Sequence, residues 1–502
     1  MNEGNRTSEE GQPNQPPTAA NPSQPQAASE TSESTRPGRG VGARRIPLRT
    51  ADIDADALKV VRKLLVANHE AFLVGGCVRD LYLNRKPKDF DVATSARPEE
   101  IRRVFRNSRI IGRRFKLAHV FFGPKIIETS TFRASPQVSE SETEGEEGRE
   151  DLLITHDNEW GSVEEDARRR DFTINGLFYD IEAQTIVDYV DGVVDLDRGI
   201  IRTIGDPRIR FREDPVRMIR AIKFAARLDF TVEQDCWAAL LEHAPDIARC
   251  SRARLVEELY KVLRGGSSRR AFELMLESGV FQHIWPAYVA LYDQYGGLHR
   301  AHRDDPRDLP SGLFWRYLGA LDDYVIETGQ IPSNGVIQTV LFAALLDADL
   351  RGGERPDLEG AIDDLMTPPC ASIGVARRDR ELARQIFMAH RRMIAPLKRG
   401  RGRISLVHRQ YFLDALLFLA FSVEARDGDG GALEHWQELA RMQQRAPESG
   451  DKPSGGGGSS SGAAGGGEGQ GRKRSGKRRR KRSKTRGARP ESSESRAPAS
   501  GE

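Results

Sequence analysis

Short apolar runs alternate with helical patterns between residues 71 and 133. Residues 71–74 (AFLV) form an apolar run that leads into two glycines, as is typical of a strand ending in a tight turn. Apolar positions at helical spacing predict a helix over 77–84, with Val78 and Leu81 on its buried face. The same signals predict strands at 90–94, 118–122 and 126–131 and a helix at 98–105. We therefore expect an α/β domain built on a small mixed sheet.

The pattern changes after Arg208 and stays helical almost to residue 445. We expect helices at 215–228, 254–263, 270–276, 337–346, 378–397 and 406–423. The predicted fold class is α+β followed by all-α. No internal repeat of fixed period is present.

The ends of the chain and one internal stretch lack this periodicity. Residues 1–46 are rich in Pro, Gly, Ser, Gln, Asn and Glu and hold too little apolar surface to offset the entropy of ordering, so we expect disorder there. We expect the same of 448–502, a Gly/Ser linker followed by a basic tail. The acidic, polar stretch at about 134–160 predicts an insertion loop.

The net charge of +3 hides a strong separation of charge along the chain. Residues 139–151 are acidic, whereas 472–489 are densely basic, which favours a polyanionic partner such as a nucleic acid over a tail that only aids solubility. The predicted RNA-binding residues of the tail are Arg472, Lys473, Arg474, Lys477, Arg478, Arg479, Arg480, Lys481 and Arg482.

Neither a membrane span nor an export signal is expected. The longest late apolar stretch, 411–423, is interrupted by Asp414 and is shorter than the ~20 residues that a span requires. The N-terminal segment lacks the apolar core of a signal peptide. Four scattered cysteines, without zinc-ligand spacing, indicate reduced thiols and hence a cytoplasmic protein.

Asp89 and Asp91 are the sharpest local feature. Carboxylates at i and i+2 on a strand project to the same face, and a divalent cation such as Mg²⁺ offsets their repulsion. An isolated pair of this kind is common on surfaces. Here Phe90 and Val92 mark a half-buried strand, and a glycine pair precedes it, so we predict a metal site.

Gly75 and Gly76 follow a predicted strand and open a predicted helix. Glycine lets the backbone approach a phosphate closely, and a helix start offers free N–H donors. Arg79 lies in the first turn and could reach the same anion, or it could form an ion pair with a neighbour on the helix. Neither a P-loop nor a dinucleotide-binding fingerprint is present.

Two further clusters combine arginine with aspartate. Arg168, Arg169 and Arg170 precede Asp171 and suit a triphosphate, while Asp171 could join the metal pair, bond a ribose hydroxyl or cap a helix. In the second cluster we expect Asp214 to cap the helix that starts at Pro215. Arg217 and Arg220 share a face of that helix. This second cluster could read a base edge or be a cap beside a solvated basic face.

Three segments, taken in order, resemble the class II nucleotidyltransferases, the family of bacterial poly(A) polymerases and CCA-adding tRNA nucleotidyltransferases. They are FLVGGCVRDLYLNRKPKDFDV (72–92), EEDARRRDFTINGLFYD (164–180) and GDPRIRFREDPVRMIRAIKFAARL (205–228). The resemblance covers roughly residues 60–290. It implies a nucleotidyltransferase head at 47–195, a helical neck and body at 196–300 that bind the base and RNA, and a helical C-terminal domain at 301–447.

The resemblance also implies roles for single residues. Asp89 and Asp91 would hold catalytic Mg²⁺, and Asp171 would be the third acidic residue of the active site. Gly76, Arg79 and Arg170 would hold the phosphates and sugar of the nucleotide. Asp214, Arg217 and Arg220 would select the incoming base. The implied activity is addition of AMP from ATP to RNA 3′ ends without a template, in RNA polyadenylation and decay, with RNA-decay proteins as possible partners.

The phrase IIGRRFKLAHVFFG (110–123) resembles the poly(A) polymerase branch, whereas CCA-adding enzymes usually carry a phrase like GxxFGTV. The insertion loop, the helical region after residue 300 and the basic tail also resemble that branch. CCA addition to tRNA is the first alternative. A non-catalytic RNA-binding protein is the second, although such a protein need not retain all three clusters.

The tail generates a first prediction. Residues 472–489 hold twelve Lys or Arg and no acidic residue. Each phosphate that they neutralise on single-stranded RNA should add ~0.7 to the log–log salt slope of binding. A chain truncated after Ser454 should therefore still add A residues, more slowly at low RNA concentration, and should bind RNA with a shallower salt dependence. Equal affinities and salt slopes for full-length and truncated protein would exclude an RNA role.

Overall fold

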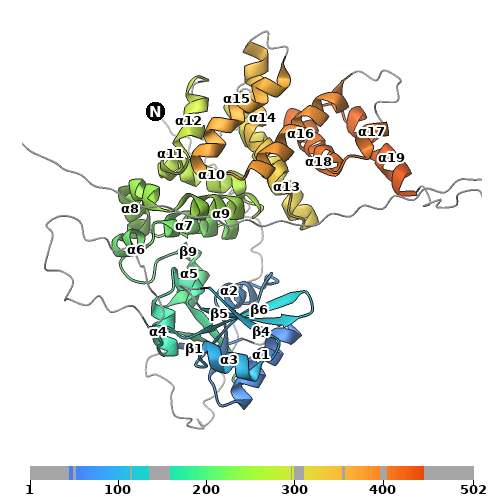
Figure 1. The fold of residues 1–502 in the computed structure, drawn as a ribbon. Coiled ribbons are helices and arrows are strands. Elements are labelled where there is room, and N and C mark those ends of the chain that lie inside the picture. Colours follow the sequence, from blue (N-terminus) through green and yellow to red (C-terminus); the bar gives the residue numbers. More distant parts are fainter. Residues whose placement is uncertain are drawn as a thin grey trace, which may run out of the picture. The chain divides into compact units, whose positions relative to one another are not determined.

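The computed structural model describes residues 44–48, 52–112, 116–134, 159–295, 297–298, 310–352, 357–395 and 404–445 (Figure 1). The basic tail, most of the N-terminal segment and of the insertion loop, and residues 113–115 of the branch-specific phrase lie outside these ranges. The predictions made for them stay predictions, as do the predicted domain boundaries.

Eight strands form one mixed sheet. They are β1 (Arg44–Pro47), β2 (Ala71–Val74), β3 (Asp91–Thr94), β4 (Ser108–Ile111), β5 (Leu117–Phe122), β6 (Lys125–Thr131), β7 (Leu177–Asp180) and β8 (Thr185–Asp188). Their order is β1-β8-β7-β2-β3-β6-β5-β4, and only β3 and β6 pair in parallel. The expected mixed sheet is confirmed. Four strands that the pattern did not identify, β1, β4, β7 and β8, complete it.

Local signals explain how the elements nearest the future site begin. The side chain of Asp54 caps α1 (Ala55–Val66) by accepting from the backbone N–H groups of Asp56 and Ala57. β2 ends at Val74 and is followed by Gly75. The φ of Gly75, 72°, lies in the left-handed region that favours glycine. The chain then turns directly into α2 (Gly76–Tyr82). α3 (Pro98–Val104) starts with proline at its first position, as the sequence predicts.

Helices make up most of the remaining chain. After α4 (Val163–Arg168) and α5 (Gly192–Arg198) come α6 (Pro207–Glu213), α7 (Val216–Leu228), α8 (Gln234–His243), α9 (Arg252–Leu263), α10 (Ser268–Glu277), α11 (Val280–Ile284), α12 (Pro286–Asp293), α13 (Pro310–Thr328), α14 (Asn334–Gly352), α15 (Leu358–Ile373), α16 (Arg377–Ile394), α17 (Ile404–Val407), α18 (Phe412–Arg426) and α19 (Gly431–Arg445). A two-stranded sheet of β9 (Ile200–Ile201) and β10 (Thr231–Val232) interrupts them. The predicted fold class, a mixed sheet followed by helices, is confirmed.

Two local predictions in this region are wrong. The single helix expected over 406–423 is split into α17 and α18 by a turn that contains the polar residues His408, Arg409 and Gln410. Asp214 does not cap α7. It ends α6 as its C-cap residue, and Pro215 takes the N-cap position of α7. Proline fixes its own φ at a value that suits a helix start, and α7 begins directly after it.

The sheet buries apolar side chains on both faces. The main core cluster runs from α1 and the sheet into α7 and the later helices. A smaller cluster covers the opposite face of the sheet, where Val74, Ala93 and Phe178 meet Val163 and Ala167 of α4. Phe172 joins the sheet domain to α7 by an edge-on ring contact with Phe224, with centroids 5.7 Å apart. Among the described residues, no helix is long and apolar enough to cross a membrane.

Candidate active site

A cavity of about 590 Å³, within the range of small-molecule sites, lies where the end of the sheet meets α7 and α9. Its lining consists of Gly75, Gly76, Arg79, Asp91, Arg170, Asp171, Asn175, Asp214, Val216, Arg217, Arg220, Phe224, Arg254, Glu257, Glu258 and Lys261. Every residue to which the family resemblance assigns a nucleotide-binding role lies in this lining, and so do two of the three candidate catalytic aspartates. The exception is Asp89.

Asp91 lies at the centre of the sheet, beside a carboxylate that the sequence analysis did not identify. In the register of the sheet Asp91 is opposite Val74 on β2 and opposite Glu128 on β6. Paired residues on neighbouring strands project to the same face, so the two carboxylates are neighbours. Burial, followed by the negative charges of Glu128 and Asp89, raises the pKa of Asp91 to about 6, although Arg170 opposes the shift. The raised pKa therefore reflects the burial of Asp91 first and the neighbouring carboxylates second.

Asp89 is placed differently from its prediction. β3 begins at Asp91, so Asp89 is an exposed residue two positions before the strand and not part of it. The strand is also buried on both faces instead of being half-buried. Asp89 is nevertheless close enough for its charge to raise the pKa of Asp91. A divalent cation could thus engage both carboxylates from the solvent side.

The glycine pair and Arg79 form one wall of the cavity. A Cβ on Gly75 would lie 3.3 Å from Nη1 of Arg170, so a side chain there would crowd the arginine. Arg79 is buried and donates from Nε and Nη2 to Asp80, at 2.8 and 2.7 Å, and from Nη1 to Oδ1 of Asn175 at 2.8 Å. The ion pair with a helix neighbour, one of the two sequence-based alternatives, is therefore present, and it fixes the guanidinium at the cavity wall.

Only one arginine of the Arg168–Arg170 run lines the cavity. Arg168 pairs with Glu164 on the exposed face of α4, at 2.9 Å. Arg170 turns inward over the ring of Phe178, 5.0 Å from its centroid, and donates to Oδ2 of Asp166 at 2.9 Å. Its Nε is buried and has no hydrogen-bond partner among the described residues. The idea of a triphosphate held by three arginines is thus reduced to Arg170.

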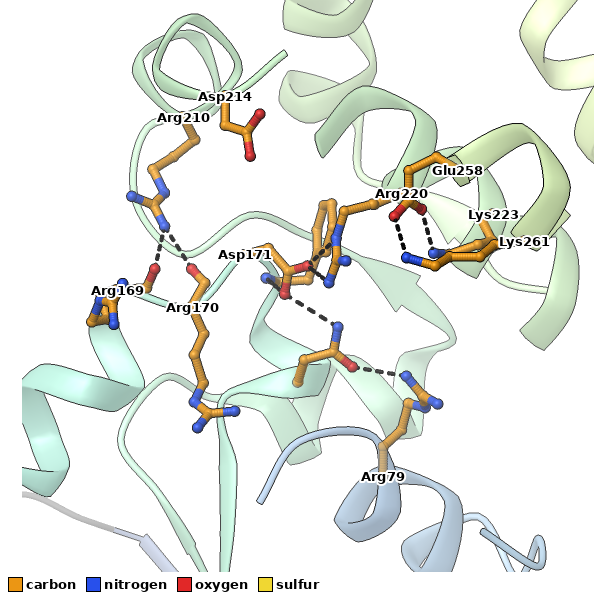
Figure 2. A network of polar contacts seen from close by, with 12 residues as sticks. Arg79, Arg169, Arg170, Asp171, Arg210, Asp214, Arg220, Lys223, Glu258 and Lys261 are labelled. Atoms are coloured by element: carbon orange, nitrogen blue, oxygen red, sulfur yellow. Dashed lines mark hydrogen bonds and ion pairs between the residues drawn. The ribbon is translucent and has the colours of Figure 1, made fainter. Parts of the chain in front are cut away.

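Asp171 and Arg220 form an ion pair across the cavity (Figure 2). Arg220 donates to Oδ2 from Nε at 2.8 Å and from Nη2 at 2.5 Å, while Oδ1 accepts from Asn175 and from the backbone N–H of Phe172. Burial alone would raise the pKa of Asp171, but Arg220 and these donors outweigh it and lower the pKa to about 2. Asp171 does not cap a helix, since Phe172 precedes the following short 3-10 helix as its N-cap.

Asp214 and Arg217 lie at the junction of α6 and α7. Oδ2 of Asp214 accepts from Nη2 of Arg254 on α9 at 2.8 Å. Oδ1 is buried and has no hydrogen-bond partner among the described residues. Arg217 is held by Oε2 of Glu213 and by the carbonyl of Arg210, at 2.7 and 2.8 Å. An acceptor and a guanidinium thus stand at the same junction in fixed positions.

Helix α9 adds a wall that the sequence analysis did not assign to the site. Glu258 is buried and accepts from Lys223 of α7 at 2.7 Å and from Lys261 at 3.0 Å (Figure 2). Burial would raise the pKa of Glu258, but the two lysines and Arg220 lower it. This arrangement balances part of the positive charge on α7 and orders Lys261 at the cavity.

Two unpredicted residues carried signals that could have been read. After its first residue, Lys125, the strand KIIETST contains one charged residue, Glu128. The other residues of the strand are apolar or carry a hydroxyl group. Asn175 lies within the quoted segment EEDARRRDFTINGLFYD (164–180). Its side chain links Arg79 to Asp171 by hydrogen bonds. Glu258 and Lys261 carried no such signal, because charges at helical spacing are usual on a solvated face.

Comparison with known families divides the chain into three matched parts. Residues 71–202 match the poly A polymerase head domain. Residues 229–291 match a probable RNA and SrmB-binding site of polymerase A, and residues 353–486 match the polymerase A arginine-rich C-terminus.

Curated relatives extend the likeness along most of the chain. Poly(A) polymerase I of Escherichia coli O6:H1 is 36% identical over 406 residues, which cover 77% of this chain and 82% of the relative. Poly(A) polymerase I of Salmonella typhi is 37% identical over 411 residues, covering 78% and 82%. The CCA-adding enzyme of Bacillus velezensis is 36% identical, but over 228 residues that cover 45% of this chain and 55% of the relative.

Among solved structures, the CCA-adding enzyme of Bacillus stearothermophilus in complex with CTP has the same fold. Its TM-score is 0.54 at 24% identity, and the match covers 77% of this chain and 82% of that one.

The Asp171–Arg220 pair gives a prediction on stability. In urea unfolding, a double-mutant cycle of Asp171→Asn and Arg220→Gln should give a coupling free energy of about 2 kcal/mol, because single replacements leave a partly buried charge without its partner. The lowered pKa of Asp171 makes this contribution complete above the ordinary value of 3.8 and lost only as the pH falls through about 2. Coupling should therefore be the same at pH 6 and pH 8.

The matched control is the exposed pair of Asp56 and Lys59, which lies at a similar distance of 2.9 Å. The cycle of Asp56→Asn and Lys59→Gln should give a much smaller coupling free energy, because solvent screens an exposed ion pair. Equal coupling in the two cycles would contradict a structural link through Asp171 and Arg220.

Proposed function

The chain belongs to the bacterial poly(A) polymerase family of nucleotidyltransferases, and on this premise we propose that its cavity binds ATP and transfers AMP to RNA 3′ ends without a template. The observation that carries the proposal is the meeting of all three sequence clusters in one cavity of ligand size. Asp91 of the sheet lies on one side of it, and Arg217 and Arg220 of α7 lie on the other. Metal, phosphate and base functions are thus available in a single site.

Mg²⁺ suits the carboxylates of the sheet. Mg²⁺ is usually held by one or two carboxylates together with substrate phosphates and water. Asp91 and Asp89 would be its ligands, and Glu128 is the register partner of Asp91 on the neighbouring strand. Burial first, and then the charges of Glu128 and Asp89, raise the pKa of Asp91, and a bound cation would oppose the effect of those charges.

The phosphates fit the wall formed by Gly75, Gly76, Arg79 and Arg170. The two glycines leave the backbone open to close approach, and the guanidinium of Arg79 is already oriented by Asp80 and Asn175. The unpartnered Nε of Arg170 is a donor whose burial is costly until an acceptor reaches it. An anionic ligand would supply that acceptor.

The base fits the junction of α6 and α7. The free Oδ1 of Asp214 can accept from an exocyclic amino group, and Arg217 can donate to the adjacent ring nitrogen of the base. Adenine and cytosine present this donor and acceptor, whereas guanine and uracil present the reverse. Arg220 contributes by holding Asp171, so its part in selecting the base is indirect.

The reaction proposed is attack of the RNA 3′-hydroxyl oxygen on the α-phosphorus of ATP. The new O–P bond forms as the bond to the bridging oxygen breaks, pyrophosphate leaves, and the hydroxyl proton passes to solvent. A bound Mg²⁺ would supply charge neutralisation and favour ionisation of the hydroxyl. The residues of the chain orient the reactants: Arg79 and Arg170 fix the phosphates, and Asp214 and Arg217 fix the base.

RNA, rather than a protein, is the proposed macromolecular substrate. The region matched to an RNA-binding family includes α8 to α12, and the basic tail would add affinity without sequence choice. Four cysteines without disulfides among the described residues support a reducing compartment, and we propose the cytoplasm. RNA-decay proteins are proposed as partners on the implied activity alone.

Replacing the carboxylates tests the metal site. Asp89→Ala or Asp91→Ala should lower AMP addition at least about a hundredfold while leaving the folded state intact, because charge neutralisation at the phosphates is lost. Glu128→Gln should retain more activity but require more Mg²⁺ for half-maximal rate. Rates are measured over a Mg²⁺ series, with Glu99→Gln on α3 as the control. Near-normal turnover of either aspartate variant in Mg²⁺ would refute the metal assignment.

Base choice is tested at Asp214 and Arg217. Asp214→Ala and Arg217→Ala should lower the ratios of ATP to GTP and of ATP to UTP incorporation by roughly tenfold or more, because a hydrogen-bonded site rejects bases that leave its buried groups unpaired. The ratio of ATP to CTP should change less, because cytosine presents the same donor and acceptor as adenine. Affinity for RNA should change little. Arg208→Ala, an exposed arginine of α6 paired with Glu242, is the control. An unchanged preference for ATP in both site variants would refute base reading by these residues. The alternative, a helix junction beside a solvated basic face, would then remain.

A further inference from the structure

A second cavity, of about 560 Å³, lies among the later helices and shares no residue with the active site. Its lining comes mainly from α14, α16 and α18, which are labelled together in the orange part of Figure 1, with Tyr317 from α13. Arg391 and Ile394 are exposed members of the lining and mark its mouth. Neither the sequence motifs nor the reaction proposed above uses this cavity.

The walls are apolar and aromatic. Leu346, Leu350 and Leu419 supply aliphatic surface. The ring of Phe418 stacks on Tyr317 with centroids 5.7 Å apart, and Phe387 meets it edge-on at the same distance. Walls of this kind favour a planar, weakly hydrated ligand, since flat rings cover such surface without losing much conformational freedom.

His390 places an unsatisfied polar atom in this wall. Its Nε2 is buried and lacks a hydrogen-bond partner among the described residues. Burial, followed by the nearby charge of Arg426, lowers the pKa of His390 to about 4, although Asp347 opposes the shift. The imidazole is therefore neutral near pH 7 and offers one donor and one acceptor. A buried polar atom without a partner is costly, so a ligand that bonds to it gains affinity.

Charged groups surround the same cavity. Asp347 accepts from Arg426 at 3.2 Å and from Arg351 at 2.7 Å, so its carboxylate is bracketed by two guanidinium groups. Arg391 adds a third positive charge at the mouth. The lining thus combines apolar and aromatic walls, a neutral hydrogen-bonding ring, and two arginines, Arg391 and Arg426, together with two carboxylates, Asp347 and Asp429. Such a lining offers donors to a phosphate and acceptors to the amino group of a base.

We propose that this cavity binds an adenine nucleotide, either as a free nucleotide or as one residue of an RNA strand. The base lies between the apolar walls and bonds to Nε2 of His390, its amino group faces Asp347, and its phosphate meets Arg391 and Arg426. The choice of adenine over other bases rests on the proposed function, because that reaction supplies both free adenine nucleotide and adenine-containing strands.

The test uses the full-length protein and AMP, which has no phosphoanhydride and so cannot react. Binding is measured by calorimetry in wild type, His390→Phe, Arg217→Ala and the control His435→Phe. His435 also has a buried Nε2 without a described partner but is not part of the cavity lining. Photocrosslinking with 8-azidoadenosine monophosphate, followed by peptide mapping, locates the site without any substitution.

The expected result is crosslinking to peptides of α16 or α18 that persists in Arg217→Ala. His390→Phe should weaken this binding about tenfold or more, the scale of one lost hydrogen bond in a buried site, whereas His435→Phe should not. Saturating rates of AMP addition should be unchanged in His390→Phe, so this test is separate from that of the proposed function. Competition by a twelve-residue oligo(A) would identify RNA as the source, and its absence would identify free nucleotide.

Three outcomes would overturn the proposal. The first is crosslinking confined to the active-site peptides, or AMP binding that Arg217→Ala abolishes completely. The second is equal AMP affinity in wild type and His390→Phe. The third is equal affinity for uridine monophosphate, which would remove the assignment of adenine. A cavity that binds no nucleotide at all would leave it as a site for a protein side chain.

Discussion

The ion pair between Asp171 and Arg220 joins two parts of the chain that supply opposite walls of the active-site cavity. Asp171 lies between α4 and β7 of the sheet, and Arg220 lies on α7. Asn175 extends the link to Arg79, and the ring contact between Phe172 and Phe224 supports it from the apolar side. Because the residues proposed to hold the phosphates and the base lie on different walls, the width of the site depends on this contact. A nucleotide of fixed length can be held only if that width is fixed too.

Most charged side chains of the cavity are oriented before any ligand arrives. Arg217 is held by Glu213, Arg79 by Asp80, and Glu258 holds both Lys223 and Lys261. Such preorganisation avoids reordering the charges during the reaction. Two atoms of lining residues have no hydrogen-bond partner among the described residues: Oδ1 of Asp214, a buried acceptor, and Nε of Arg170, a buried donor. They are the groups whose pairing a bound nucleotide would improve most.

At the sheet, by contrast, carboxylates lie beside one another. Its register places Asp91 beside Glu128, and Asp89 adds a third negative charge. Burial first, and then these charges, raise the pKa of Asp91 to about 6. No packing requirement calls for clustered carboxylates at the centre of a sheet, and their repulsion lowers stability. Perturbed groups of this kind are concentrated at functional sites. The fold tolerates the cluster because the apolar faces of the sheet are buried on both sides.

Local sequence determined the central strands, the glycine turn, most helices and the residue types of the site, because these follow from side-chain period, glycine backbone freedom and motif spacing. It did not determine that Glu128 faces Asp91, since strand register joins residues far apart in sequence. Nor did it determine that Asp214 ends one helix and pairs with Arg254, or that Arg168 turns away while Arg170 turns inward. Those outcomes depend on which elements pack together. A charged side chain can serve as a cap, a surface pair or a ligand with the same local sequence, and only its tertiary neighbours decide which.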